Sequence, residues 1–178
     1  QRILLDTGQG AALAENARTL GVDLGQTDAL VLSHGHYDHT GAVPLVLGAA
    51  PHAQVYCHPC VTEPRYSIRD GAVRDIRMPH FSMNALGILP LSRMHWSGEP
   101  VRLGEGMGLS GFIPRRTDFE DTGGPFYLDP LGQRPDPLQD DQALWIATEA
   151  GLVVCVGCCH AGLINTLLHL REITGERR

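Results

Sequence analysis

Short apolar runs alternate with amphipathic segments along the first third of the chain. The runs at 2–5, 29–33 and 54–57 have the length and composition of buried strands. Between the first two runs, apolar residues recur at helical spacing up to a glycine at position 21, and Pro44 suits the first turn of a helix within 41–50. This alternation of strand and helix predicts a layered α/β fold.

Regular patterns are weaker between residues 58 and 140, where glycine and proline interrupt short apolar pieces. The pattern there predicts short strands and long loops, with a surface loop at 129–141. Two apolar runs at 143–149 and 151–158 predict a β-hairpin. A helix should follow from residue 163 and end at Gly175. Because no linker or repeat interrupts the chain, we expect a single domain over residues 1–178.

Composition narrows the functional classes. The 178 residues carry 20 acidic and 14 basic side chains, a net charge of −6, which argues against nucleic-acid binding driven by overall charge. No apolar stretch reaches the roughly 18 residues of a membrane span, and no signal peptide is recognisable. We therefore expect a cytoplasmic protein with reduced thiols, since the five cysteines are odd in number and unevenly spaced: Cys57, Cys60, Cys155, Cys158 and Cys159.

The segment "HGHYDH" at residues 34–39 directly follows a predicted strand. In an extended loop, His34 and His36 point the same way and can share one ion, whereas Asp38 and His39 can turn toward a second. Imidazole and carboxylate ligands suit zinc, iron or manganese, and three protein ligands with an open position are typical of catalytic sites. A polar loop whose histidines contact only water or backbone is the alternative. His160 lies in a similar loop between a strand and a helix.

The motif "LSHGHYDHTG" resembles the metal-binding signature of the metallo-β-lactamase superfamily. The segments "LLDTGQG", "FIPRRTDFE" and "GCCHAG" resemble one subgroup of it, named for the dihydropterin ribofuranosylaminobenzene 5'-phosphate synthase of methanopterin biosynthesis. The resemblance implies an α/β fold of the metallo-β-lactamase type, an αββα sandwich. It also implies a metal-dependent hydrolase or transferase that uses a metal-bound hydroxide on a small molecule, phosphorylated or pterin-like. A catalytically silent metal-binding or interaction module is the alternative.

The resemblance also implies roles for individual residues. His34, His36 and His160 would bind one divalent ion, zinc before iron or manganese. Asp38 and His39 would bind a second, with Asp38 also orienting the nucleophilic water. Asp6 would support the metal-binding loop from behind.

Two weaker signals remain open. Arg115 and Arg116 either bind a phosphate or carboxylate of the substrate or form a surface pair with Asp118 or Glu120. The two C-x-x-C pairs either build a structural zinc site or, as we favour, supply small buried side chains.

Members of the subgroup extend beyond the segments that match this chain, at both ends. We therefore expect residues 1–178 to be the middle portion of the family fold, in which a further metal ligand is lacking. A homo-oligomer that completes the fold is one alternative to a fragment of an intact enzyme.

Overall fold

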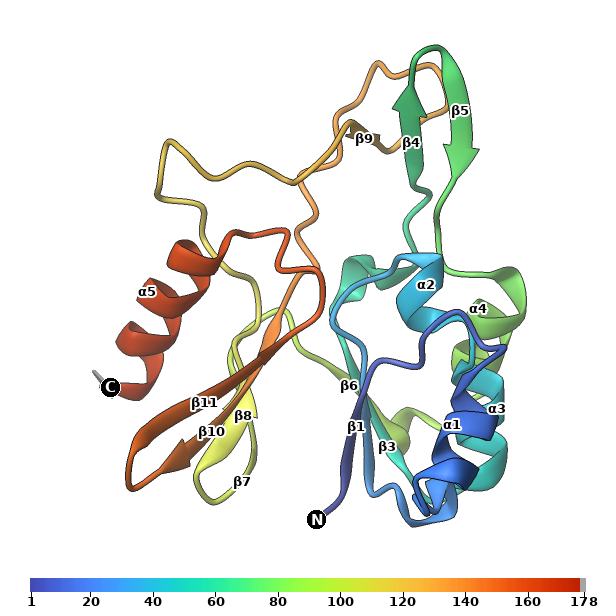
Figure 1. Cartoon of the computed structure of the whole chain (residues 1–178), viewed down its shortest axis with the longest axis vertical. Helices are drawn as coiled ribbons and strands as arrows, with labels where there is room; N and C mark the ends of the chain where they lie inside the picture. Colours follow the sequence, from blue (N-terminus) through green and yellow to red (C-terminus); the bar gives the residue numbers. More distant parts are fainter. Residues whose placement is uncertain (177–178) are drawn as a thin grey trace.

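Two four-stranded sheets face each other in the computed structural model, which describes residues 1–176 (Figure 1). The first sheet is parallel, in the order β1 (Ile3–Leu5), β2 (Ala29–Val31), β3 (Gln54–Cys57) and β6 (Met94–Trp96). The second is antiparallel, in the order β11 (Gly151–Val156), β10 (Ala143–Thr148), β8 (Met107–Leu109) and β7 (Val101–Gly104).

Helices cover the outer faces of both sheets (Figure 1). The first sheet is covered by α1 (Leu13–Thr19), α3 (Val43–Ala49) and α4 (His80–Gly87), and the second by α5 (Leu163–Thr174). The short helix α2 (Tyr37–Thr40) lies within the histidine motif, and 3-10 turns occur at Leu24–Gln26, Pro59–Thr62 and Leu91–Arg93. Within residues 1–176, no helix combines the length and the apolar character needed to cross a membrane.

Side-chain alternation along β2 and β10 explains the layering. Leu30 packs in a cluster with residues of α3 and α4, whereas its neighbour Val31 packs on the opposite face with Leu109 and Leu144 of the second sheet. Trp145, next to Leu144, packs in a third cluster that includes Leu170 of α5. Each sheet is therefore buried on both faces, and the predicted αββα sandwich is confirmed.

A third, smaller sheet rises above the two main ones (Figure 1). It pairs the hairpin β4 (Tyr66–Arg69) and β5 (Ala72–Asp75) with the short strand β9 (Phe126–Tyr127). This part of the chain has the short strands and long loops that its interrupted pattern predicts. Helix α4 was not predicted, because only Ser82 and Leu86 of its eight residues are buried and no side chain caps its start.

The fully buried side chain of Arg65 lies where the layers and the small sheet meet. Its Nη1 and Nη2 each donate to a different carboxylate oxygen of Asp140 at 2.7 Å, and its Nε lies 3.1 Å from Oδ2 of Asp136. Burial would lower the pKa of Arg65, but the two carboxylates outweigh it and the pKa is raised. The same Asp140 Oδ2 accepts from the backbone N of Gly35 at 2.7 Å, inside the histidine motif.

This ion cluster corrects the prediction of a surface loop at 129–141. The segment is irregular, as predicted, and its first part is mostly exposed. Its second part belongs to the protein interior: Asp136, Leu138, Asp140 and Asp141 are all buried. Proline and aspartate are typical of solvated loops, but here the carboxylates are the counter-charges of an internal arginine.

Arg65→Met should destabilise the fold by about 3–5 kcal/mol, because it leaves two carboxylates buried without their counter-charge. Urea unfolding followed by circular dichroism measures the change. Arg18→Met is the matched control: the Arg18–Glu15 pair is exposed, and its loss should leave the unfolding midpoint nearly unchanged. Equal unfolding midpoints for the two variants would contradict the role of Arg65.

Candidate metal centre

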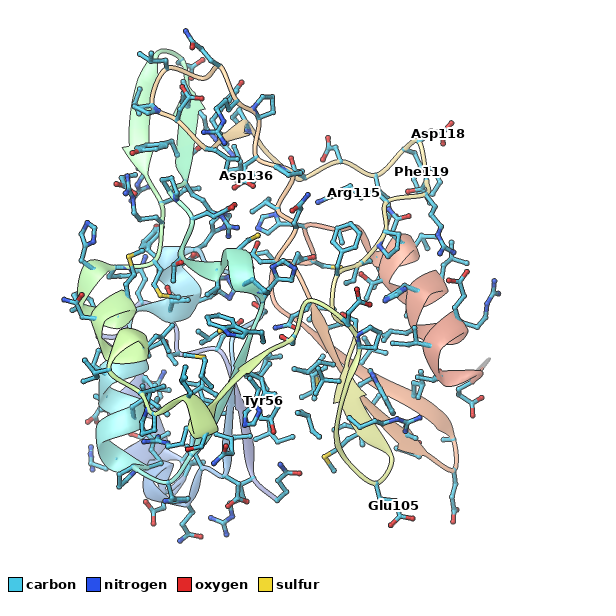
Figure 2. The ribbon with its side chains drawn as sticks, turned by 180° about the vertical axis from the view of Figure 1, so that it is seen from behind. Tyr56, Glu105, Arg115, Asp118, Phe119 and Asp136 are labelled. Atoms are coloured by element: carbon cyan, nitrogen blue, oxygen red, sulfur yellow. The ribbon has the colours of Figure 1, made fainter. Side chains whose placement is uncertain are left out.

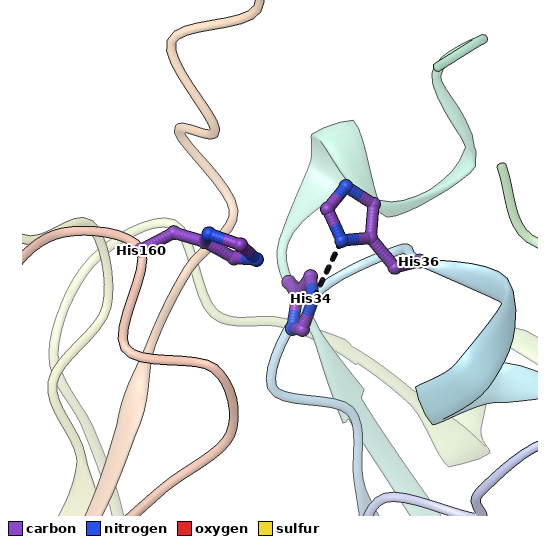
Figure 3. Close-up of side chains that lie close together, drawn as sticks. All are labelled: His34, His36 and His160. Atoms are coloured by element: carbon purple, nitrogen blue, oxygen red, sulfur yellow. Dashed lines mark hydrogen bonds between the residues drawn. The ribbon is translucent and has the colours of Figure 1, made fainter. Parts of the chain in front are cut away.

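Three histidines from two layers of the fold converge at one point (Figure 3). His34 and His36 lie in the loop after β2, and His160 lies in the loop between β11 and α5. Each offers one ring nitrogen, and the three nitrogens all lie within 4.8 Å of one another. The cluster is at the carboxyl end of β2, where ligands of layered α/β folds commonly bind.

Two of these histidines carry ring nitrogens without a protein partner. Nδ1 of His160 lies 2.6 Å from the carbonyl O of Thr122, to which it must donate, so the lone pair of this ring is on Nε2. Nε2 of His160 and Nε2 of His36 are both buried and have no hydrogen-bond partner. Unpaired buried nitrogens are rare in native proteins, and converging imidazole lone pairs fit a divalent cation.

Burial favours the neutral form of His34 and His36. Burial, reinforced by the neighbouring histidines, holds the pKa of His34 well below its usual value. Burial, and then electrostatic repulsion from the neighbouring His160 and Arg65, lower the pKa of His36 to about 2. Both rings are therefore neutral near neutral pH and each has one nitrogen with a free lone pair, which is the form that binds a metal ion.

Asp6 organises the histidine loop from behind. It follows β1 and adopts a left-handed backbone conformation, with a φ of 61°. Its carboxylate accepts from the backbone N and from the hydroxyl of Ser33, both at 2.7 Å, and lies 2.7 Å from Nδ1 of His39. The Ser33 hydroxyl in turn lies 2.9 Å from Nδ1 of His34. One carboxylate thus orients His39 directly and His34 through Ser33, as the supporting role predicted for Asp6 requires.

A second candidate position lies beside the first. Nδ1 of His39 faces Asp6, so Nε2 is the nitrogen left to bind a ligand, and it lies 3.1 Å from Sγ of Cys158 and 3.9 Å from Oδ2 of Asp38. His34, His39 and Cys158 also have ligand atoms within 4.8 Å of one another. Asp38 is exposed at the edge of this group, so its assignment as a ligand stays a prediction.

Cys158 is a site residue that the sequence did not assign. Burial, and then the nearby carboxylate of Asp38, raise the pKa of its thiol to about 11. A bound cation would reverse this effect, since metals deprotonate the thiols that they bind. The available signal was its place two residues before His160. Cys159 between them has a φ of 56°, and this turn lets both neighbours line one cavity.

Arg115 and Arg116, the arginines predicted to bind substrate, form hydrogen bonds and ion pairs within the protein. Arg115 donates to the backbone carbonyls of His160 and Pro137, and Arg116 is paired with Glu172 on α5. Figure 2 shows Asp118 at the outer edge of the same loop, where it is not the partner of either arginine. The guanidinium of Arg115 supports the loop that carries His160 and that of Arg116 is tied to α5, and the binding of substrate by either stays a prediction.

Glu120, the other partner considered for these arginines, has a different task. Its carboxylate accepts from the backbone N of Ile164 at 2.8 Å and of Asn165 at 2.9 Å, so it caps the start of α5.

The four cysteines of the C-x-x-C pairs do not form a zinc site in the described part of the chain. No group of three close ligand atoms within residues 1–176 includes Cys57, Cys60 or Cys155. Cys57 is fully buried beside Met94, and burial raises the pKa of its thiol to about 12. Cys155 packs against the cluster between the two sheets. Both side chains contribute to packing, as favoured from the sequence, whereas the same prediction was wrong for Cys158, which is exposed.

A cavity of about 450 Å³ opens above the histidines. His36, Asp38, Cys158 and His160 line its base. The ring of Phe126, from β9, covers one side and lies 5.2 Å from the ring of His36 and 5.3 Å from that of His160. The hairpin β4–β5 lines another side. The candidate metal position is thus partly shielded from solvent yet open to a small molecule.

Comparison with known proteins agrees with this geometry. Residues 1–157 match the profile described as the metallo-beta-lactamase superfamily. The chain is 26% identical, over 98% of its length, to 7,8-dihydropterin-6-methyl-4-(beta-D-ribofuranosyl)-aminobenzene-5'-phosphate synthase of Methanocaldococcus jannaschii, of which the match covers 61%. It is 29% identical to the protein MJ0448 of the same organism, with 98% and 66% of the two chains covered.

A solved structure is similar over the same extent. The crystal structure of Tm1679, titled a metal-dependent hydrolase of the beta-lactamase superfamily, aligns with a TM-score of 0.76 and 29% identity. The alignment covers 98% of this chain and 62% of that one. The chain therefore spans about three fifths to two thirds of the length of these relatives.

His36→Ala should remove most of the metal-binding capacity while leaving the helix and strand content intact, because it deletes a converging lone pair from a loop. Elemental analysis of purified protein, with circular dichroism alongside, measures both. His52→Ala, an exposed histidine outside the cluster, is the control and should bind metal as the wild type does. Full metal content in the His36 variant would contradict the site.

Asp6→Asn should weaken metal binding by about 10–100-fold, because the amide cannot accept from Ser33 and His39 together as the carboxylate does. Competition with a chromogenic chelator measures the affinity. Asp28→Asn changes an exposed carboxylate at the opposite end of β2 and should leave the affinity unchanged. An unchanged affinity in the Asp6 variant would show that the histidines need no such support.

Proposed function

The chain belongs to the metallo-β-lactamase superfamily, and we propose that it carries the catalytic metal centre of a metal-dependent hydrolase or transferase. The superfamily consists largely of enzymes, and one relative of this chain is named as a synthase. The reaction and substrate proposed below go beyond that general statement.

One observation carries the proposal: the three histidines converge, with buried and unpartnered ring nitrogens, at the base of an open cavity. A structural metal site would be closed by a fourth protein ligand, whereas a catalytic site keeps a position for water or substrate. The cavity above His36 and His160 provides that position. The adjacent group around His39 supports a second ion beside the first.

We assign zinc to the centre, because imidazole with a thiol at the second position suits zinc; iron and manganese are the other ions that this set accepts. When bound, such ions act as Lewis acids and activate water. Two side chains of the cavity, Asp38 and Phe126, would position the water and exclude bulk solvent. Asp38, at the cavity base and 3.9 Å from Nε2 of His39, is placed to orient a water and to accept its proton. Phe126 limits the access of bulk water.

The substrate proposed is a small phosphorylated or pterin-like molecule. The 26% identical relative supports it, since that protein is named a 7,8-dihydropterin-6-methyl-4-(beta-D-ribofuranosyl)-aminobenzene-5'-phosphate synthase. A cavity of about 450 Å³ is large enough for a molecule of this size. A hydrolase and a transferase would share the same activation of the substrate and differ only in the group that accepts the transferred part.

The proposal predicts metal-dependent turnover. Zinc-loaded protein should hydrolyse bis(p-nitrophenyl) phosphate or p-nitrophenyl phosphate, lose that activity with a chelator and regain it with zinc. Asp38→Asn should lower kcat by about 10²–10⁴-fold, because a positioned proton acceptor is lost while the three-histidine position keeps its ion. Steady-state kinetics and metal content are measured on the same samples.

Asp23→Asn is the control, since its carboxylate is exposed and only caps the turn at Leu24–Gln26. Bound metal without turnover of any ester tested would favour the catalytically silent metal-binding module over the enzyme.

A further inference from the structure

The hairpin β4–β5 presents one face to the cavity above the histidines. Ser67 and Arg69 alternate on β4, and their cross-strand partners on β5 are Arg74 and Ala72. Side chains that alternate on one strand and pair across the ladder share a face of the sheet, and all four of these residues line the cavity. Phe126 is paired with Ser67 and continues the same face.

This face carries two arginines without a counter-charge. Within residues 1–176, neither Arg69 nor Arg74 forms an ion pair with a carboxylate, in contrast to Arg65, Arg77 and Arg116. The hairpin's own acid at the register position next to Arg74, Asp75, points to the other face and pairs with Arg77. The guanidinium of Arg74 lies 5.7 Å from the ring centre of Tyr37, the residue after His36. Arg74 is therefore held close to the metal-binding loop.

Arg69 and Arg74 both line this cavity, although the chain has six more acidic than basic side chains. The carboxylate that does line the cavity, Asp38, is at its base with the proposed metal ligands. The wall formed by the hairpin is therefore positive, and the hydroxyl of Ser67 adds a further hydrogen-bond donor. Planar guanidinium groups bind phosphate and carboxylate oxygens through paired hydrogen bonds.

We propose that the hairpin β4–β5 is the substrate-recognition element of this site, in which Arg69 and Arg74 bind an anionic group of the substrate, a phosphate or a carboxylate. The inference rests on the proposed function, because it places this group beside the bond that reacts at the metal centre. It assigns the recognition of charge to arginines of the hairpin, whereas Arg115 donates to the backbone of His160 and Arg116 pairs with Glu172 on α5.

Calorimetric titration of the metal-loaded chain with inorganic phosphate, and separately with acetate, tests the proposal. Arg69→Gln and Arg74→Gln should each weaken the binding of at least one of these anions by about 10–100-fold, the loss expected for a charge-assisted hydrogen bond. A larger loss for phosphate identifies a phosphate group, and a larger loss for acetate identifies a carboxylate. Circular dichroism and elemental analysis should show unchanged fold and metal content.

Arg102→Gln is the matched control. Arg102 also lacks a carboxylate partner within the described chain, and its guanidinium lies 4.9 Å from the ring centre of Trp145, outside this cavity. It should leave anion binding unchanged.

Unchanged affinity for both anions in the Arg69 and Arg74 variants would overturn the proposal, as would a loss no greater than that in the Arg102 variant. Loss of metal together with anion affinity would also overturn it, since the arginines would then act through the fold. Failure of the wild type to take up metal would instead count against the proposed function, and the anion titration of that sample would still test the arginines.

Discussion

The buried guanidinium of Arg65 is the interaction on which the rest of the structure depends. An arginine can be removed from water only if its charge and its donors are matched, and Asp136 and Asp140 supply both. These three residues come from the base of the β4–β5 hairpin and from the segment that leads into β10. Because Asp140 also accepts from the backbone of Gly35, the same cluster fixes the loop that carries His34 and His36. Stability and site geometry are therefore coupled through one set of buried charges.

The candidate centre is shared between the two layers of the sandwich. His34, His36 and His39 follow a strand of the parallel sheet, whereas Cys158 and His160 follow a strand of the antiparallel one. The layers approach closely here: a Cβ at Gly157 would lie 2.2 Å from the hydroxyl of Ser33, so only glycine fits at this position. The side chain of Gln142 also donates to the carbonyl of Leu32 at 2.8 Å. The ligand set is consequently assembled by the packing of the two sheets, and neither sheet holds it alone.

Much of this arrangement could be predicted from the sequence, because it is recorded in local patterns. Apolar runs, and the glycine and proline residues that bound them, predict several of the elements. These are the strands at Ala29–Val31 and Gln54–Cys57, the hairpin of β10 and β11, and the helix that ends at Gly175. The spacing of the histidine motif pointed to a metal site in the same way. What could not be predicted depends on distant partners. The sequence around Asp140 is typical of a solvated loop, and its burial depends on an ion pair with Arg65, 75 positions away. Cys158 becomes a candidate metal ligand only because the fold brings it next to His39, 119 positions away.

The charge of the cavity depends on which ionisable groups face it and which are buried or face away from it. Burial favours the neutral form of His36 at the base, so the charge there comes from the carboxylate of Asp38 and from the ions that the base would bind. The hairpin wall is positive by itself, because Arg69 and Arg74 line the cavity whereas neither acidic residue of the hairpin, Asp70 or Asp75, does. Strand alternation produces this separation: a shift of one residue in the pairing of β4 and β5 would turn Arg74 away from the face of Ser67 and Arg69 and bring Asp75 onto it. The register of a small, mostly exposed sheet thus determines the sign of the charge that faces the metal centre, and the buried Arg65 at its base holds that sheet in place.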